Sequence, residues 1–296
     1  MKALYYLLIV PLSRAPRWFL YGISDNLLFP VIYHLVGYRK KVVYNNVRKA
    51  FSNKSELEAQ QITKDFFHHF CDLIVESIMI FNISEEQAIA RCRLVNPEIF
   101  EQCYKNNKSV VFVGGHYNNW EMLAVAIAPQ VPHQVDAIYA PLTNKFMDDL
   151  IRSSRSKYGL RLIPKQETNE FLDKTKGEKT AMIFATDQSP SRKQRAYWME
   201  FMGLETAMAF GAERNAVKYD WPVIYGRIKK VKRGEYIIEA ELISDKPTEE
   251  PYGYITQKHA RLLEQDLMEN PAYWLWTHKR WKRKRPADNP VQKNLF

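Results

Sequence analysis

A histidine and a glutamate five residues apart are the first candidates for chemistry in this sequence. They lie in "VVFVGGHYNNWEML", residues 110–123, where an apolar run ends at two glycines and apolar residues then resume at helical spacing. If a helix begins near Asn118, His116 lies just before it, and Glu121 in its first turn can turn back to the imidazole. A carboxylate on one ring nitrogen fixes the tautomer and leaves the other nitrogen to take a proton from a hydroxyl. We therefore predict that His116 and Glu121 are catalytic.

A purely structural interpretation of the same residues stays open. Asn118 followed by Glu121 also suits a helix N-cap with a capping box, in which case His116 is an ordinary loop residue. Gly115 would let a substrate approach the backbone closely. The G-x-S-x-G pattern of serine nucleophiles is absent, so the sequence does not indicate a covalent enzyme intermediate. Direct attack by a substrate hydroxyl on an acyl donor fits these residues better.

The surrounding elements predict an α/β fold with a mostly parallel central sheet flanked by helices. The β-branched run 109–115 is typical of a strand buried on both faces. Further strands are predicted at 135–141, 180–190 and 221–228, with an antiparallel strand at 234–243. Helical patterns fall at 55–80, 84–92, 97–106, 119–128, 144–158, 167–176 and 206–219, with a last long helix ending before Pro271. Ser55 with Glu58 predicts a capping box at the start of the first. Alternation of strands and helices over the middle of the chain indicates the parallel arrangement.

Two polar residues follow the third predicted strand. Ligands of open α/β sheets bind outside the carboxyl ends of the strands. Asp187 and Gln188 are therefore expected beside His116, although about 70 residues separate them in the sequence. The alternative is that they only cap the turn at the end of the strand.

The first 38 residues predict a membrane-anchoring helical segment, and residues 39–296 the catalytic domain. The apolar run 3–12 is too short to cross a bilayer, and the run 18–38 is interrupted by Asp25, Asn26 and Pro30. We expect an uncleaved anchor that is interfacial or shallowly inserted, with the basic residues after it on the cytoplasmic side. The alternative is a buried amphipathic hairpin of a soluble enzyme.

The charge balance points to an anionic partner. Of 296 residues, 43 are Lys or Arg and 33 are Asp or Glu, for a net charge of +10. Such an excess suits nucleic acid, anionic lipid or an acidic protein. Trp274, Trp276 and Trp281 accompany the basic tail 279–285, which suits either base stacking or anchoring at lipid headgroups. Since no DNA-binding motif accompanies the tail, the membrane is favoured, and Lys279, Arg280 and Lys282 are candidates to contact it. The three cysteines form no metal pattern, and we expect no metal site.

Several segments together resemble a known family. H-x4-[DE] after a strand resembles the acyltransferases of glycerolipid and lipid A assembly. "GYRKKVVYNNVRKAF" (37–51), "TDQSP" (186–190), "FMGLETAMAFGAERNA" (201–216) and "NPAYWLWTHKRWKRKRP" (270–286) resemble segments of the late (lauroyl/myristoyl) acyltransferases of lipid A biosynthesis. The resemblance covers nearly the whole chain, in order.

The resemblance implies transfer of a fatty acyl group from acyl carrier protein to a hydroxyl of a lipid A precursor, at the cytoplasmic face of the inner membrane. It implies no cofactor besides acyl-acyl carrier protein as co-substrate. The partners would be acyl carrier protein, the lipid acceptor and the membrane, with no nucleic acid. His116 and Glu121 would be the catalytic pair. The substrate-binding residues would be Gly115, Arg155, Asp187, Gln188 and Thr206.

Some assignments keep alternatives. Arg155 would stabilise an oxyanion or hold a phosphate, or it is only a surface helix charge. The threonine-rich part of the family's block is reduced here to Thr206, which leaves its role open. Arg192, Lys193 and Arg195 are candidates for a positive rim that speeds encounter with anionic substrates. Rival functions are the same chemistry on another membrane lipid, such as a lysophospholipid, aminolipid or glycolipid, and a non-catalytic membrane or nucleic-acid binding protein.

Overall fold

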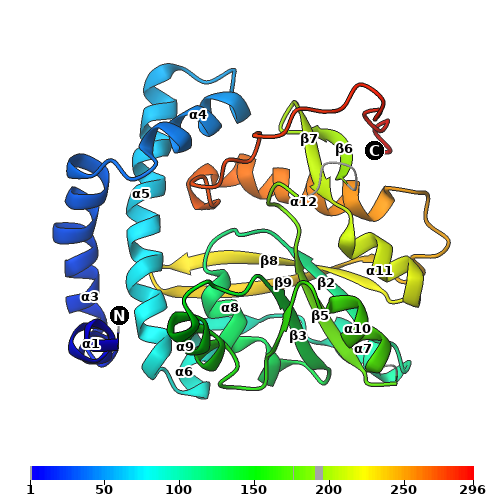
Figure 1. Cartoon of the computed structure of the whole chain (residues 1–296), viewed down its shortest axis with the longest axis horizontal. Helices are drawn as coiled ribbons and strands as arrows, with labels where there is room; N and C mark the ends of the chain where they lie inside the picture. Colours follow the sequence, from blue (N-terminus) through cyan, green and yellow to red (C-terminus); the bar gives the residue numbers. More distant parts are fainter. Residues whose placement is uncertain (1, 176, 191–195) are drawn as a thin grey trace.

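A seven-stranded sheet forms the centre of the structure, a computed structural model that describes residues 2–175, 177–190 and 196–296 (Figure 1). Its strand order is β1-β9-β8-β2-β5-β3-β4, and every neighbouring pair is parallel except β8 and β9. The strands are β1 (Cys92–Leu94), β2 (Val110–Gly114), β3 (Gln134–Tyr139), β4 (Arg161–Pro164), β5 (Thr180–Ala185), β8 (Val223–Lys232) and β9 (Glu235–Ser244). The predicted α/β fold with a mostly parallel sheet is confirmed, and so is the antiparallel strand after residue 234.

The sheet alternates its side chains between two cores, as a central strand should. From β2, Val110 and Phe112 join one core with Met122 of α8 (Trp120–Ala126). Val111 and Val113 join the opposite core with Ala212 of α11 (Gly211–Tyr219). These four residues of β2 are almost completely buried. The prediction that this run is a strand buried on both faces is therefore confirmed.

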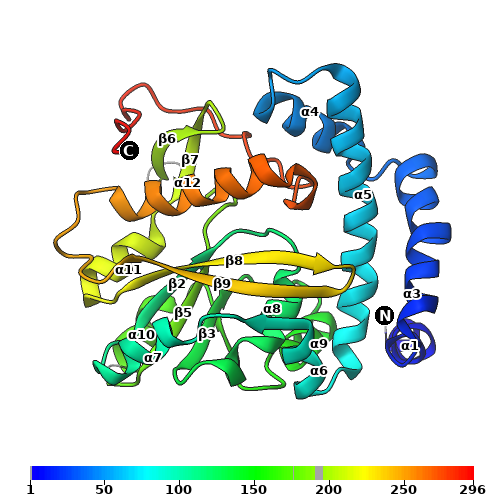
Figure 2. The same ribbon diagram turned by 180° about the vertical axis from the view of Figure 1, so that it is seen from behind.

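The helices match most of the predicted ones. α5 (Glu56–Met79) begins with the predicted capping box, in which Ser55 and Glu58 bond each other's backbone. The others are α6 (Glu85–Arg91), α7 (Glu98–Lys105), α9 (Lys145–Arg155), α10 (Thr168–Lys174) and α12 (Tyr254–Glu269). α12 lies across the face of the sheet that α11 also covers, as both views show (Figures 1 and 2).

One predicted helix was partly wrong. Residues 206–209, expected to start it, belong to β7 (Leu204–Ala209), which pairs with β6 (Ala196–Phe201) in a separate hairpin. The two-residue turn at Met202 and Gly203 has positive φ at both positions, the geometry that matches the twist of a hairpin. Cross-strand pairing with a segment earlier in the chain overrides the helical pattern of 206–209.

The N-terminal segment packs alongside α5, on the side away from the sheet (Figures 1 and 2). It runs through α1 (Lys2–Leu4), α2 (Val10–Ser13) and α3 (Arg17–Ile23), with π-helical stretches at Tyr5–Ile9, Ser24–Leu28 and Pro30–Leu35, and is followed by α4 (Lys40–Ala50). Among the described residues no single helix is long and apolar enough to span a membrane; Arg17–Leu35 and Lys40–Ala50 meet that test only as a pair bent by 82°.

Two polar residues within the N-terminal apolar run, Ser24 and Asp25, contact the rest of the protein. Asp25 pairs with Arg233 in the β8–β9 turn at 2.6 Å, and the Ser24 hydroxyl donates to Asp72 of α5 at 2.8 Å. Leu20 is fully buried against α5. The opposite side leaves large apolar side chains in solvent, with Leu7, Trp18 and Leu35 each more than 75% exposed. The segment is therefore amphipathic: two of its polar side chains contact the rest of the protein, and several large apolar side chains face solvent.

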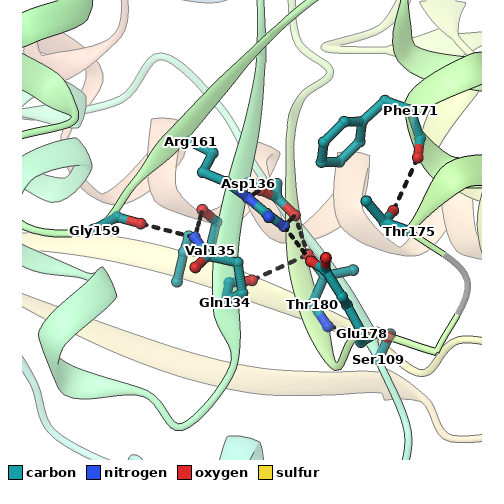
Figure 3. Close-up of polar contacts among 10 residues, drawn as sticks. All are labelled: Ser109, Gln134, Val135, Asp136, Gly159, Arg161, Phe171, Thr175, Glu178 and Thr180. Atoms are coloured by element: carbon teal, nitrogen blue, oxygen red, sulfur yellow. Dashed lines mark hydrogen bonds and ion pairs between the residues drawn. The ribbon is translucent and has the colours of Figure 1, made fainter.

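A second polar cluster fastens the amino ends of three strands (Figure 3). Asp136 on β3 is fully buried and receives both Nε and Nη2 of Arg161 on β4, at 2.6 and 3.1 Å. The Thr180 hydroxyl on β5 donates to the same carboxylate, and Arg161 also reaches Glu178 at 2.7 Å. Each buried oxygen of Asp136 thus has a protein donor, as the interior requires.

Candidate active site

Register places the histidine and the aspartate together. In the parallel pairing of β2 with β5, Gly114 lies opposite Ala185, and His116 and Asp187 each follow two residues later. His116 Nδ1 lies 2.7 Å from Asp187 Oδ1, and the His116 backbone N–H donates to Oδ2 at 2.9 Å. The expectation that Asp187 lies beside His116 at the carboxyl edge of the sheet is met.

The carboxylate on the imidazole is Asp187, and the prediction that Glu121 turns back to it was wrong. α8 begins one residue later than expected: Asn119 is the N-cap and accepts from the Met122 backbone N–H at 2.8 Å. Asn118 instead has a positive φ and donates its side-chain amide to the Ile228 carbonyl. Neither the capping box nor the return of Glu121 to the imidazole is formed, because the turn at Asn118 rotates the start of the helix.

Glu121 is paired with Arg155, the last residue of α9. Arg155 Nε lies 2.7 Å from Oε2 and Nη2 lies 2.5 Å from Oε1, the two-pronged geometry of an Arg–carboxylate pair. The Trp120 indole N–H also donates to Glu121, at 3.2 Å, and its ring meets the His116 ring edge-on with centroids 5.4 Å apart. The pair therefore lies next to the histidine through Trp120, and Arg155 is more than a solvated surface charge.

The electrostatics of the centre favour a basic imidazole. Burial would lower the pKa of His116, but the charge and hydrogen bond of Asp187 and the charge of Glu121 outweigh it and raise the pKa above its usual value. Burial would likewise raise the pKa of Asp187, yet His116 and the Trp274 indole hold it well below its usual range. Asp187 thus stays ionised and keeps Nδ1 protonated, so Nε2 can accept a proton.

The second partner of Asp187 comes from the C-terminal strap, residues 273–278. The Trp274 indole N–H donates to Asp187 Oδ2 at 2.7 Å. The strap also pairs with the loop after β2: the Leu275 N–H donates to the His116 carbonyl, and the Asn118 N–H donates to the Tyr273 carbonyl. The strap thus holds the backbone of the histidine as well as the side chain of the aspartate.

α4 in turn fastens the strap. The Asn46 side-chain amide donates to the carbonyls of Trp276 and His278, at 2.9 and 2.8 Å, and Arg39 donates to the Thr277 carbonyl at 3.0 Å. Asn46 lies in the segment 37–51 that the sequence singled out. Its contact gives a physical reason for an asparagine there, since one amide satisfies two carbonyls of the strap.

Two tryptophans of the tail, Trp274 and Trp276, are core residues. The expectation that these two stack on bases or anchor at headgroups was wrong. Trp274 and Trp276 are almost completely buried, and Trp276 donates to the Pro271 carbonyl at 2.6 Å. Arg280, expected to contact a membrane, is 2% exposed and donates to the Ala207 carbonyl. Apolar burial against α12 and the β6–β7 hairpin outweighs the basic character of the surrounding sequence.

An apolar pocket of about 100 Å³ opens beside Glu121. It runs along α5 from the acidic residue, and its walls are Phe70, Leu73, Ile74, Ser77, Asn119, Trp120 and Glu121. An apolar wall next to a histidine–aspartate pair suits a substrate with a hydrocarbon part.

A model of the family described as bacterial lipid A biosynthesis acyltransferase matches residues 9–283. The chain belongs to this family. The match includes every candidate site residue described above, from Asn46 to Arg280, and confirms the resemblance found in the sequence. The comparison with curated proteins gave no match.

The remaining predicted residues of this lipid A acyltransferase family member lie as follows. Gly115 leaves space for neighbouring side chains of the protein itself, since a Cβ there would lie 3.1 Å from Leu263 and 3.5 Å from Asp187. Gln188 places Nε2 at 3.4 Å from His116 Nε2. Thr206 accepts from the Trp281 indole at 2.8 Å and bonds the Leu204 carbonyl. Its hydrogen bonds among the described residues thus join the hairpin to the tail, and do not reach the histidine.

Arg192, Lys193 and Arg195, proposed from the sequence as a positive rim, lie outside the described residues.

Sequence reasoning missed the residues that support the pair. Trp120, Trp274 and His278 stood in quoted motifs, but no spacing rule relates residues 120 and 274 to an aspartate at 187. The available signal was chemical: indole N–H groups and a histidine in an apolar, aromatic segment need buried partners. Of these three side chains only Trp274 donates to Asp187; Trp120 donates to Glu121, and His278 accepts from the Ser189 backbone N–H.

Proposed function

We propose that the protein transfers a fatty acyl group from acyl carrier protein to a hydroxyl of a lipid A precursor, without a covalent enzyme intermediate. The observation that carries this proposal is the His116–Asp187 pair beside an apolar pocket, in a chain of the lipid A acyltransferase family. No cofactor takes part in the proposed reaction.

In the proposed mechanism His116 is the general base. Its Nδ1 is held by Asp187, so Nε2 takes the proton of the acceptor hydroxyl as the oxygen attacks the acyl carbonyl. The tetrahedral intermediate then collapses, and the same nitrogen returns the proton to the leaving sulfur. Asp187 stabilises the imidazolium formed between the two steps, because its own pKa is far too low for it to take the proton.

Glu121 and Arg155 have a different role in this proposal. Their paired geometry fixes the first turn of α8 against the end of α9, next to Trp120. The Glu121 charge also contributes to the raised pKa of His116. Glu121 therefore acts on the base through the field and through Trp120, and Arg155 holds Glu121 in place.

Residues 1–38 are proposed to anchor the protein at the cytoplasmic face of the inner membrane. Support comes from the outward apolar side chains of this segment, among them Trp18 and Leu35. A lipid interface would bury them, at about 25 cal/mol per Å² of apolar surface removed from water. The segment lies against α5, and α5 lines the apolar pocket, so a lipid surface there would adjoin the entrance for acyl chains.

The function is tested with purified protein, an acyl-acyl carrier protein and a lipid A precursor with a free hydroxyl. Mass spectrometry of the products should show one added acyl group and free carrier thiol, and His116→Ala should abolish the product while the protein stays folded. Transfer to lysophospholipids with none to the lipid A precursor would contradict the proposed acceptor. No transfer from any acyl thioester would contradict the chemistry.

The anchor is tested by flotation with vesicles. Trp18→Ser combined with Leu35→Ser should lower the bound fraction several-fold. The matched control, Val217→Ser with Tyr252→Ser, changes exposed apolar residues on α11 and just before α12, at the far end of the molecule from α1 and α3 (Figure 1). Equal binding of both variants would contradict anchoring by this segment.

A further inference from the structure

The side-chain amide nitrogen of Gln188 lies 3.4 Å from Nε2, the reactive nitrogen of His116. Because Asp187 accepts from Nδ1, the neutral imidazole has an unprotonated Nε2 that can only accept a hydrogen bond. The Gln188 amide nitrogen, 3.4 Å away, is the group that can donate to it. The tautomer set by Asp187 therefore turns the N–H side of the amide, and not its oxygen, toward the place where substrate reacts.

A hydroxyl arriving at Nε2 would replace this weak contact. Once the hydroxyl donates to Nε2, the amide N–H is free and lies beside the same point. The hydroxyl oxygen and the acyl carbonyl oxygen become attached to one carbon in the tetrahedral intermediate. Two nitrogens 3.4 Å apart can therefore serve both oxygens, Nε2 as the base and the amide as a hydrogen-bond donor.

Arg155, a cation near the centre, is less suited than the Gln188 amide to donate to the carbonyl oxygen. Arg155 directs Nε and Nη2 at Glu121 in a two-pronged pair. Releasing either nitrogen to a substrate oxygen would break a charge-assisted hydrogen bond to a carboxylate, one of the stronger kinds in proteins. The Gln188 amide loses only a long contact when it turns to the substrate.

The loop that carries Gln188 is fixed on both sides by the C-terminal strap. Before it, Asp187 receives the Trp274 indole N–H at 2.7 Å. After it, the Ser189 backbone N–H donates to His278 Nε2 at 3.0 Å. This contact requires a neutral His278, and burial together with the charges of Lys282 and Arg280 lowers its pKa to about 4. His278 therefore stays an acceptor throughout the neutral range.

We propose that the Gln188 amide donates to the carbonyl oxygen of the acyl thioester as that oxygen becomes negative, and that His278 is a positioning residue which aims it. This role rests on the proposed function. The acceptor oxygen bonds to the carbonyl carbon, its proton goes to His116 Nε2, and the carbonyl electron pair moves to the oxygen held by Gln188. That pair then re-forms the carbonyl, the carbon–sulfur bond breaks, and the thiolate takes the proton back from Nε2.

The test compares two donors, a pantetheine thioester and the matching dithioester, in which sulfur replaces the carbonyl oxygen. Sulfur is a poor hydrogen-bond acceptor, so the wild-type protein should use the dithioester much more slowly. Gln188→Ala should lower kcat with the ordinary thioester by about 10²–10³, with KM nearly unchanged. It should also remove most of the rate difference between the two donors. Gln188→Glu, which keeps the size but has no N–H, should behave like Gln188→Ala.

His278 is tested in parallel. His278→Phe, which removes the acceptor for Ser189, should lower kcat by about tenfold and reduce the difference between the donors, and His278→Gln, which keeps an acceptor, should restore part of both. A Gln188→Ala protein with an unchanged ratio between donors would overturn the oxyanion role, whatever its absolute rate. A wild-type protein inactive with the ordinary thioester, whether the acyl group is carried by pantetheine or by acyl carrier protein, would overturn the proposed function and this role together.

Discussion

Two buried aspartates at opposite edges of the same sheet make similar contacts and serve different ends. Asp136, near the amino ends of the strands, is bound by Arg161 and Thr180 (Figure 3). Asp187, at the carboxyl edge, is bound by His116 and Trp274. The Arg161 guanidinium is permanently charged and also pairs with Glu178, so it neither titrates nor offers a basic nitrogen to a substrate. The imidazole titrates and keeps one nitrogen for a substrate.

The comparison shows that burial of an ion pair does not by itself mark a catalytic site. What distinguishes Asp187 is the identity of its partner, since a histidine can change its charge near neutral pH and an arginine cannot. Removing Asp136 should therefore cost stability, and removing Asp187 should cost activity.

The largest effect is expected at the base itself. His116→Ala should lower kcat by up to about 10⁴, because the acceptor hydroxyl then has no group to take its proton. Steady-state acyl transfer measures the loss, and circular dichroism checks that the fold is kept. Wild-type turnover in a folded variant would show that His116 is not the base, and Asp187 would then have no catalytic partner to distinguish it from Asp136.

The second-largest effect is expected for Asp187→Asn, which should lower kcat by at least about 10². The amide cannot hold the Nδ1–H tautomer or stabilise the imidazolium. Burial then dominates, so the pKa of His116 should fall below that of the wild-type protein. A variant with the rate of wild type would show that Glu121 alone supports the base.

Asp136→Asn should affect the fold. It leaves Arg161, which is 37% exposed and still pairs with Glu178, without its buried counter-charge, and should lower the free energy of unfolding by about 1–3 kcal/mol. Urea unfolding measures this, and kcat of the folded fraction should stay near that of wild type. The matched control is Glu170→Gln, which breaks an exposed pair with Lys174 and should leave the urea unfolding midpoint nearly unchanged. A stable Asp136→Asn protein with a low kcat would reverse the comparison.

Trp274→Phe should lower kcat by about tenfold, since Asp187 loses one hydrogen bond worth about 1.5–3 kcal/mol. Trp281→Phe is the control: its indole donates to Thr206, on the hairpin, and acyl transfer should stay near the wild-type rate. Equal losses in both variants would mean that the indoles act through packing alone.

The smallest effect is a shift along the pH axis. The unprotonated imidazole is the active form, so kcat/KM should rise with pH through the pKa of His116. Since that pKa is raised above 6.5, half of the maximal value should be reached above pH 6.5. In Asp187→Asn the midpoint should move to lower pH. A wild-type midpoint below 6.5 would show that Asp187 does not raise the basicity of the histidine.

The sequence predicted the parts of the fold that depend on local pattern. The buried strand 109–115 and the capping box at Ser55 follow from adjacent residues, and parallel topology then brings Asp187 to His116. The predicted contact between Glu121 and the imidazole is not formed, because one left-handed residue, Asn118, moves the start of α8. Composition does not reveal such a turn for a non-glycine residue.

Contacts between distant segments could not be predicted in the same way. The β6–β7 hairpin forms around a Met-Gly turn that is not among the strong hairpin signals. Trp274 reaches Asp187 across 87 residues, and Asn46 reaches the strap across more than 200. Only the folded chain specifies these pairs, because nothing local in either segment depends on the other.

The fastening of the strap by Asn46 also sets the order in which the protein becomes active during synthesis. Strands β2 and β5 can pair while the chain is still being translated, but the indole that fixes Asp187 arrives 87 residues later, and the histidine that fixes Ser189 arrives 89 residues later. The contact between residues 46 and 276 then closes a loop of 230 residues, among the slowest kinds of contact to form. Chains that stop before residue 273 should therefore fold a sheet with a histidine and an aspartate in place, yet remain poor catalysts.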